Sequence, residues 1–150
     1  MMGTDKAKEE LKLMIILFKT YQTLTNFIKA DISNSDFNLN EFAVLEVIYH
    51  KGSISVNEIS QKVLVANSSL TYILDKLVKK SLIQRTQDNK DKRVTYISLT
   101  NKGEKLAKDI FPPHYEHLME VFNVLSAEEK LTASRILKKL SLSVVNKNDK

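Results

Sequence analysis

Residues 88–103 read DNKDKRVTYISLTNKG, a charged turn followed by a β-branched run and then by a helix start. Turn-forming residues and cations occur together over residues 88–93, and short strand-like runs flank them at residues 82–86 and 94–99. A hairpin built from these two runs would project the positive charge of its tip. The stretch therefore predicts a wing that is aimed at an anionic partner.

Helix-start signals precede this hairpin. Asn38 followed by Glu41 forms a capping-box pattern and predicts a helix over residues 39–50, and Ser55 followed by Glu58 predicts a shorter helix over residues 56–64. Apolar positions at helical spacing predict a third helix up to about residue 80. Helices followed directly by a charged hairpin indicate a winged helix-turn-helix, so the expected fold class is mainly α with a small β-hairpin wing (α+β).

The third helix has a polar face opposite its apolar stripe, with hydroxyl groups first, then one aromatic ring and cations. In a helix-turn-helix, such a face reaches bases and phosphates in the major groove of DNA, whereas the plain alternative is a solvated helix face. The wing beside it favours nucleic-acid binding. The expected DNA contacts on this helix are Asn67, Ser68, Ser69, Thr71, Tyr72, Lys76 and Lys79.

The wing tip supplies a second set of expected DNA contacts, Lys90, Asp91, Lys92 and Arg93. A guanidinium suits a narrow A·T-rich minor groove, so Arg93 is expected to enter one. Asp91 is expected to orient Arg93 through a charge-assisted pair, and both lysines are expected to meet phosphates. The alternative for Asp91 and Arg93 is a surface ion pair without function.

Amphipathic helices are predicted on both sides of the winged helix. An apolar pattern from Lys6 to about Ala30 is wider than one stripe, which indicates a subunit interface, with an ordinary core helix as the alternative. After the wing, a helix capped by Thr100 is predicted to be interrupted at Pro112-Pro113, where lost donors and ring clashes kink or break it before the chain restarts. Ser126 with Glu129 predicts the start of the last helix.

We therefore expect one domain over residues 1–150. Dimerisation helices would occupy residues 5–32 and 104–146 and flank a winged helix over residues 37–103. A two-fold homodimer would place its recognition helices roughly 34–36 Å apart, so the DNA target is expected to be an inverted repeat.

Composition bounds the function. The 150-residue chain is 43% hydrophobic and carries 23 Lys and Arg against 18 Asp and Glu, a net charge of +5 that favours anionic partners. The absence of cysteine excludes disulfides and thiolate metal sites, and three glycines supply no phosphate-binding loop. No apolar run approaches 18 residues. We expect a cytoplasmic protein that is not an enzyme, with no cofactor and no membrane partner.

Asp91, Arg93, Leu99, Thr100 and Gly103 match the D-x-R-x5-L-T-x2-G signature of the MarR family of bacterial transcriptional regulators, which the chain resembles over almost its whole length. That resemblance implies homodimers whose terminal helices interlock and which mostly repress transcription until a ligand releases them. The segments EFAVLE at 41–46, YHKG at 49–52, RVTY at 93–96 and IFPPH at 110–114 resemble the catechol- and quinone-responsive MhqR-type repressors. The chain departs from the family pattern at Ser81, where glycine is common, and at Tyr72, where arginine is common.

A pocket for a small aromatic effector is expected where the first helix, the second helix and the segment after the prolines converge. Phenol- or quinone-like ligands would suit an apolar lining with one carboxylate and one imidazole. The alternative is that these aromatic residues are core. The candidate lining residues are Met14, Phe18, Phe42, Glu46, Tyr49 and His114.

Two other functions stay open. His114 and His117, one helical turn apart, could belong to a metal-sensing site, although no third ligand is evident, so no metal residues are predicted. A winged helix can also serve as a protein-interaction module that never touches DNA.

Overall fold

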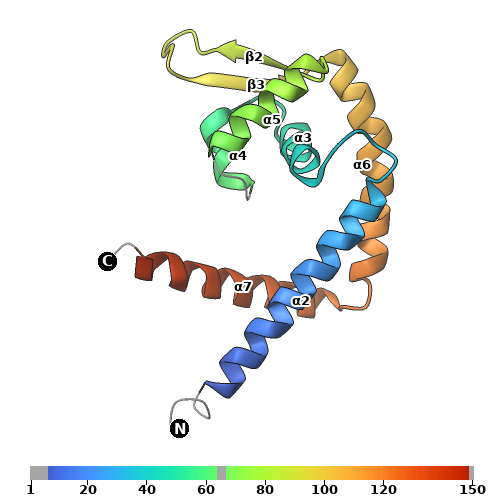
Figure 1. The fold of residues 1–150 in the computed structure, drawn as a ribbon, viewed down its shortest axis with the longest axis vertical. Coiled ribbons are helices and arrows are strands. Elements are labelled where there is room, and N and C mark those ends of the chain that lie inside the picture. The colour runs from blue at the N-terminus through green and yellow to red at the C-terminus, as the bar shows by residue number, and fades with distance from the viewer. Residues whose placement is uncertain (1–6, 64–66, 149–150) are drawn as a thin grey trace. The chain divides into compact units, whose positions relative to one another are not determined.

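The computed structural model of the protein describes residues 7–63 and 67–148, without the side chains of residues 67 and 146–148. Its elements, labelled as in Figure 1, are α2 (Lys8–Asp31), α3 (Leu39–Lys51), β1 (Ile54–Ser55), α4 (Val56–Lys62), α5 (Asn67–Lys79), β2 (Ile83–Gln87), β3 (Thr95–Leu99), α6 (Asn101–Phe122) and α7 (Ala127–Asn148). The mainly helical class with a small β-hairpin is confirmed. The chain forms two compact units, Met1–Asp109 and Ile110–Lys150.

The core of the first unit lies among α3, α4, α5 and the sheet. Ile48, Ile59, Leu70, Leu77 and Ile97 are almost completely buried there. They come from α3, α4, two turns of α5 and β3, so one apolar cluster holds the two helix-turn-helix helices against the sheet. This packing fixes which face of α5 remains outside.

The capping boxes that the sequence predicts are present. The Asn38 and Ser55 side chains accept the amides of Glu41 and Glu58, and each glutamate returns a bond to the backbone of its partner. The third predicted box is also confirmed, because the Ser126 amide donates to Glu129 and the Glu129 amide donates to Ser126 Oγ. Local chemistry thus sets the starts of α3, α4 and α7.

The wing is a three-stranded antiparallel sheet in the order β1-β3-β2. In β2 and β3, Ile83 pairs with Leu99 and Gln87 with Thr95, which forms the predicted hairpin (Figure 1). A third strand that the sequence does not predict is β1, in which Ile54 pairs with Ile97 and Ser55 with Tyr96. Two residues are too few to show the alternation by which a strand is recognised.

Of the two outcomes predicted at Pro112-Pro113, a kink or a break, the break is wrong. Both prolines lie inside α6, which runs from Asn101 to Phe122. The proline φ near −65° fits a helix, but each proline lacks the amide that would have bonded the carbonyl oxygen of Lys108 or Asp109, and its ring crowds that same carbonyl. The division between the two compact units falls at these same positions, after Asp109.

The turn after α5 ends in a Schellman motif. The Ser81 amide donates to the Val78 carbonyl at 2.8 Å and the Leu82 amide to the Leu77 carbonyl at 3.0 Å. Ser81 has φ 59°, the left-handed conformation that favours glycine. This conformation explains why the departure from glycine at residue 81 matters physically.

The Leu-Thr-x2-Gly part of the signature joins this turn to α6. Thr100 donates its amide to the Leu82 carbonyl at 3.0 Å and its hydroxyl to the Ser81 carbonyl at 2.6 Å, and Thr100 Oγ1 accepts the Gly103 amide at 3.0 Å. A Cβ on Gly103 would collide with the Leu82 carbonyl oxygen. These residues therefore have a structural role, which is to fix the start of α6 on the turn after α5.

Candidate nucleic-acid interface

Helix α5 presents its polar face to the outside because the opposite face enters the core. Leu70, Ile73, Leu74 and Leu77 are buried at helical spacing. Ser68, Ser69, Thr71 and Lys79 are exposed, and Tyr72 is 65% exposed. The Asn67 side chain lies outside the described residues. The exposed N-terminal half is rich in hydroxyl groups, as predicted, whereas the exposed C-terminal half combines Asp75 with Lys79, and Lys76 is half-buried.

Backbone hydrogen bonds to aspartate side chains organise the wing tip. Asp88 Oδ1 accepts the amides of Lys90 and Asp91 at 2.7 and 2.8 Å, which is an Asx-turn pattern. The Asp88 amide donates to the Val94 carbonyl and the Val94 amide to the Asp91 carbonyl. The tip is therefore a closed loop with Lys90, exposed at its surface, and Lys92 beside it.

The predicted pair between Asp91 and Arg93 is present. Arg93 Nε donates to Asp91 Oδ1 and Nη2 to Oδ2, both at 3.0 Å, so the guanidinium is held by two parallel bonds. The Arg93 side chain is nevertheless 90% exposed. Hydrogen bonds from Arg93 lower the pKa of Asp91, and the bond to Asp91 raises the pKa of Arg93. Arg93 is oriented while its outer surface stays accessible.

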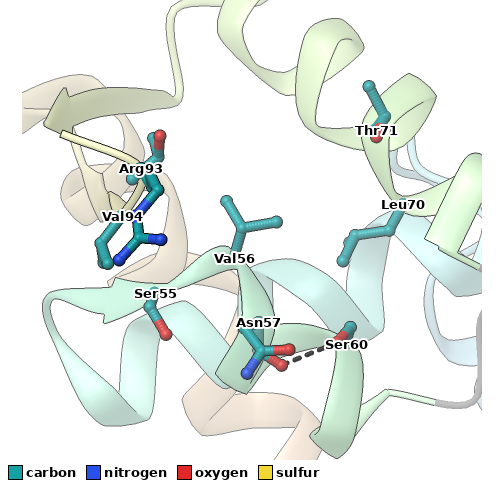
Figure 2. A pocket seen from close by; sticks show the side chains of 9 residues that line it. Ser55, Val56, Asn57, Ser60, Leu70, Thr71, Arg93 and Val94 are labelled. Carbon is teal, nitrogen blue, oxygen red and sulfur yellow. Dashed lines mark hydrogen bonds between the residues drawn. The ribbon is translucent and has the colours of Figure 1, made fainter. Parts of the chain in front are cut away.

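A hollow of about 560 Å³ lies between the wing and the helix-turn-helix. Figure 2 shows Arg93 and Val94 on one side of it, Leu70 and Thr71 on the other, and the start of α4 with Ser55 and Asn57 between them. The Ser60 hydroxyl donates to the Asn57 carbonyl at 2.7 Å in the same wall (Figure 2). Thr71 and Arg93, which the sequence assigns separately to the two DNA-contacting elements, thus line one cavity.

A second hollow of about 370 Å³ lies beside the start of α5. Ser68, Ser69 and Tyr72 line it together with Asn38 and Asn40 from the start of α3. The exposed face of α5 is therefore bordered by hollows at two places. Asn38 and Asn40 were not among the predicted site residues.

Lys76, one of the expected DNA contacts on α5, has a protein partner. Its ammonium lies 2.5 Å from Oε1 of the buried Glu41 carboxylate and 5.7 Å from the centre of the Tyr72 ring. Burial raises the pKa of Glu41, but hydrogen bonds from Lys76 and the Asn38 amide, with the charges of Lys80 and Lys76, lower it overall. The hydrogen bond to Glu41 raises the pKa of Lys76. The sequence predicts Glu41 only as a capping residue, since nothing in its local pattern signals its burial.

The six candidate effector residues lie in different environments. Phe42 is 2% exposed and belongs to the core, whereas Met14 and Phe18 are exposed on α2. Glu46 and Tyr49 are half-buried on α3, and His114 is buried on the second unit. Core packing, the alternative stated for these aromatics, holds for Phe42.

Tyr49 also lines a hollow of about 500 Å³ in the first unit. The end of α3, the strand β3 and the first turns of α6 form its wall, with Glu104 and Lys108 as charged members. Of the six candidates, Tyr49 is the one that lines this cavity. An ammonium and a phenol are thus brought to one concave surface.

Within residues 7–63 and 67–148, no group of three or more His, Cys, Asp or Glu side chains could hold a metal ion. No helix in the described part of the chain is long and apolar enough to cross a membrane.

An exposed recognition helix beside a cationic wing defines a winged helix-turn-helix protein of the DNA-binding class. Residues 37–95 match the model of the MarR family. The HTH-type transcriptional regulator MhqR of Bacillus subtilis (strain 168) is 39% identical over 136 residues, which cover 91% of this chain and 94% of that protein. The chain belongs to the MarR family and is a DNA-binding transcriptional regulator, not an enzyme.

Solved structures support the same fold. A single-residue mutant of MarR from E. coli in complex with operator DNA superimposes with a TM-score of 0.75 at 25% identity, covering 89% of this chain and 96% of that one. NadR in complex with 4-hydroxyphenylacetate gives a TM-score of 0.75 at 23% identity over 84% of this chain and 89% of NadR. The MarR-like winged helix is thereby confirmed.

Proposed function

We propose that this regulator binds an inverted-repeat operator as a homodimer and represses transcription until a small phenol- or quinone-like ligand releases it. The observation that carries the DNA part is the shared cavity of Thr71 on α5 and Arg93 on the wing. Both proposed readers border one concave surface of the same unit, with the start of α4 between them. A duplex could therefore meet the helix and the wing together.

The proposed contacts divide by chemistry. Hydroxyl and phenol groups at Ser68, Ser69, Thr71 and Tyr72 would meet base edges and phosphates, Arg93 would enter the minor groove, and Lys79, Lys90 and Lys92 would neutralise phosphates. Asn67 would join the first group.

The homodimer is supported by helix α2. None of its residues is buried, although many are apolar. The apolar residues Leu13, Ile15, Ile16 and Phe18 are each at least half exposed. A helix with so much exposed apolar surface needs a cover in water. A second copy of the chain is the proposed cover.

Binding to the DNA upstream of the chain's own gene tests the proposal. Fluorescence anisotropy with this duplex and with a shuffled duplex of equal length should show preference for the first. We expect two subunits per duplex and an affinity that falls steeply with salt concentration. A salt slope near zero would favour a protein-interaction module, and equal steep-slope binding to both duplexes would contradict a specific operator in this DNA.

For the effector, Glu46 and His114 are the proposed polar groups and Met14, Phe18 and Tyr49 the proposed apolar groups, whereas Phe42 belongs to the core. NadR was solved with 4-hydroxyphenylacetate, an aromatic acid of similar size to the proposed ligands. The Tyr49 cavity, with Lys108 in its wall, gives a phenol or an aromatic anion one place to bind.

Hydroquinone should release the operator reversibly and without a covalent adduct, because the chain has no cysteine to react. Glu46→Ala and His114→Ala should raise the concentration needed for release, whereas Glu116→Ala, an exposed neighbour of His114, should not. Unchanged release by the first two variants would contradict this ligand assignment.

A further inference from the structure

Glu41 is a buried carboxylate at the start of α3. It is 1% exposed, and it is the one acidic side chain that is buried among the described residues. Its Oε2 accepts the Asn38 amide at 3.1 Å, which closes the capping box. Capping alone does not require burial, because Glu58 makes the same bonds at the exposed start of α4.

Two lysines of the recognition-helix segment reach this carboxylate. Lys76 Nζ lies 2.5 Å from Oε1, and Lys80 Nζ lies 3.8 Å from Oε2. Lys80 also donates to the Asp36 carbonyl at 2.8 Å and lies 4.7 Å from the centre of the Phe37 ring. The last turns of α5 are thus tied to the first turn of α3 and to the loop before it.

A second ion pair ties α5 to the wing. Asp75 Oδ1 accepts a bond from Arg85 Nη2 on β2 at 2.7 Å. This pair is partly exposed, so it contributes little on its own. Glu41 differs, because a buried carboxylate that loses its cation is strongly unfavourable. Of the two ion pairs, the one at Glu41 therefore contributes more to the orientation of α5, in addition to the apolar core that α5 shares with α3.

We infer that Glu41 is a positioning residue for operator recognition, and that Lys76 serves this ion pair instead of contacting a DNA phosphate. The inference builds on the proposed DNA reading by α5. Turning α5 about the Glu41 contact would move Ser68, Ser69 and Tyr72 together, since they lie on one helix. Loss of Glu41 should harm sequence discrimination more than it harms non-specific attraction.

The first test compares two glutamates that share a capping role. Glu41→Gln keeps a carbonyl oxygen for the Asn38 amide but removes the charge, and Glu58→Gln makes the same change at α4. Anisotropy titrations with the upstream duplex and a shuffled duplex give the discrimination ratio. We expect Glu41→Gln to lower this ratio about tenfold or more, and Glu58→Gln to leave it unchanged.

The second test measures salt dependence. Each phosphate contact adds about 0.9 to the slope of log affinity against log salt, so Lys79→Met should flatten the slope of a dimer by about 1.8. Lys76→Met should leave the slope unchanged, because its charge is already balanced by Glu41. A Lys76→Met slope that flattens as much as that of Lys79→Met would overturn the inference.

The double variant Glu41→Gln/Lys76→Met separates positioning from stability. Removing both partners leaves no unpaired buried charge, so thermal stability should recover relative to Glu41→Gln. Discrimination should stay low, because the tie to α3 is gone. If thermal stability and discrimination recovered together, Glu41 would contribute to stability alone and the inference would be overturned. A discrimination ratio in Glu41→Gln equal to that of the wild type would also overturn it. If the wild type binds neither duplex, the proposed function fails as well.

Discussion

Ser81 carries the one positive φ among the non-glycine residues that the structure describes. The left-handed backbone conformation costs an L-residue about 1–2 kcal/mol, a cost that glycine does not have. Glycine in turn loses about 0.5–1 kcal/mol more backbone entropy on folding than other residues. Ser81→Gly should therefore stabilise the fold by about 0.5–1 kcal/mol, or about 1–4 °C in Tm. Thermal unfolding checks this. Ser81→Ala, which keeps the Cβ, should give no gain, and an equal gain in both variants would contradict the explanation.

Glu41 gives stability a pH dependence at the residue scale. The folded-state pKa of Glu41 lies below its ordinary value of 4.5, so its contribution is present above pH 4.5 and is lost as pH falls through the lower value. The free energy of unfolding of the wild type should exceed that of Glu41→Gln at pH 7, and the gap should narrow below pH 4.5. Chemical denaturation at pH 7, 5, 4 and 3 measures this difference in the free energy of unfolding. A difference that does not change with pH would contradict the lowered pKa of Glu41.

At the scale of elements, Gly103 decides how α6 meets the turn after α5. A methyl group there would collide with the Leu82 carbonyl oxygen, which belongs to backbone and has little freedom to move. Gly103→Ala should destabilise the protein by about 1–3 kcal/mol, even though alanine favours helices. Lys105→Ala, an exposed change in the same helix, should stay within about 0.5 kcal/mol. Equal urea midpoints for the two variants would contradict the close approach.

The wing depends on the shape of Arg93 as well as on its charge. Lysine would keep the charge but lose the two parallel bonds to Asp91. Arg93→Lys should weaken operator binding by about 1–3 kcal/mol without changing the salt slope, whereas Lys90→Met should flatten the slope. Anisotropy titrations at four salt concentrations distinguish the two effects. A flattened slope in Arg93→Lys, or full affinity, would argue against a minor-groove role.

At the scale of the whole molecule, the exposed apolar surface of α2 predicts assembly. Ile15, 51% exposed, is a suitable position to place a charge, and Gln22→Glu on the same helix is a control at a polar position. Ile15→Glu should shift sedimentation from dimer to monomer and abolish tight operator binding, because two half-sites are no longer held together. A monomeric Ile15→Glu that binds the operator as tightly as the wild type would contradict the dimer model.

Features that depend on neighbouring residues could be predicted from the sequence. Capping boxes at Asn38, Ser55 and Ser126, the hairpin at the wing and the Asp91–Arg93 pair all depend on groups close together in the chain, and the structure confirms each. The MarR signature identified the family, although it did not say why Thr100 and Gly103 belong to it. The single domain and its three parts stay a prediction.

Contacts between groups far apart in the chain became known from the folded structure alone. Glu41 faces Lys76 across α3 and α5, Gly103 touches the backbone of Leu82, and the two residues of β1 pair with the distant strand β3. Because the capping residue Glu41 is buried, its charge must be paired. Lys76, which the sequence predicts as a DNA contact, is the partner. The helix α6 also continues through two prolines, where local rules predict an end. These outcomes depend on the environment that folding creates, which no local pattern encodes.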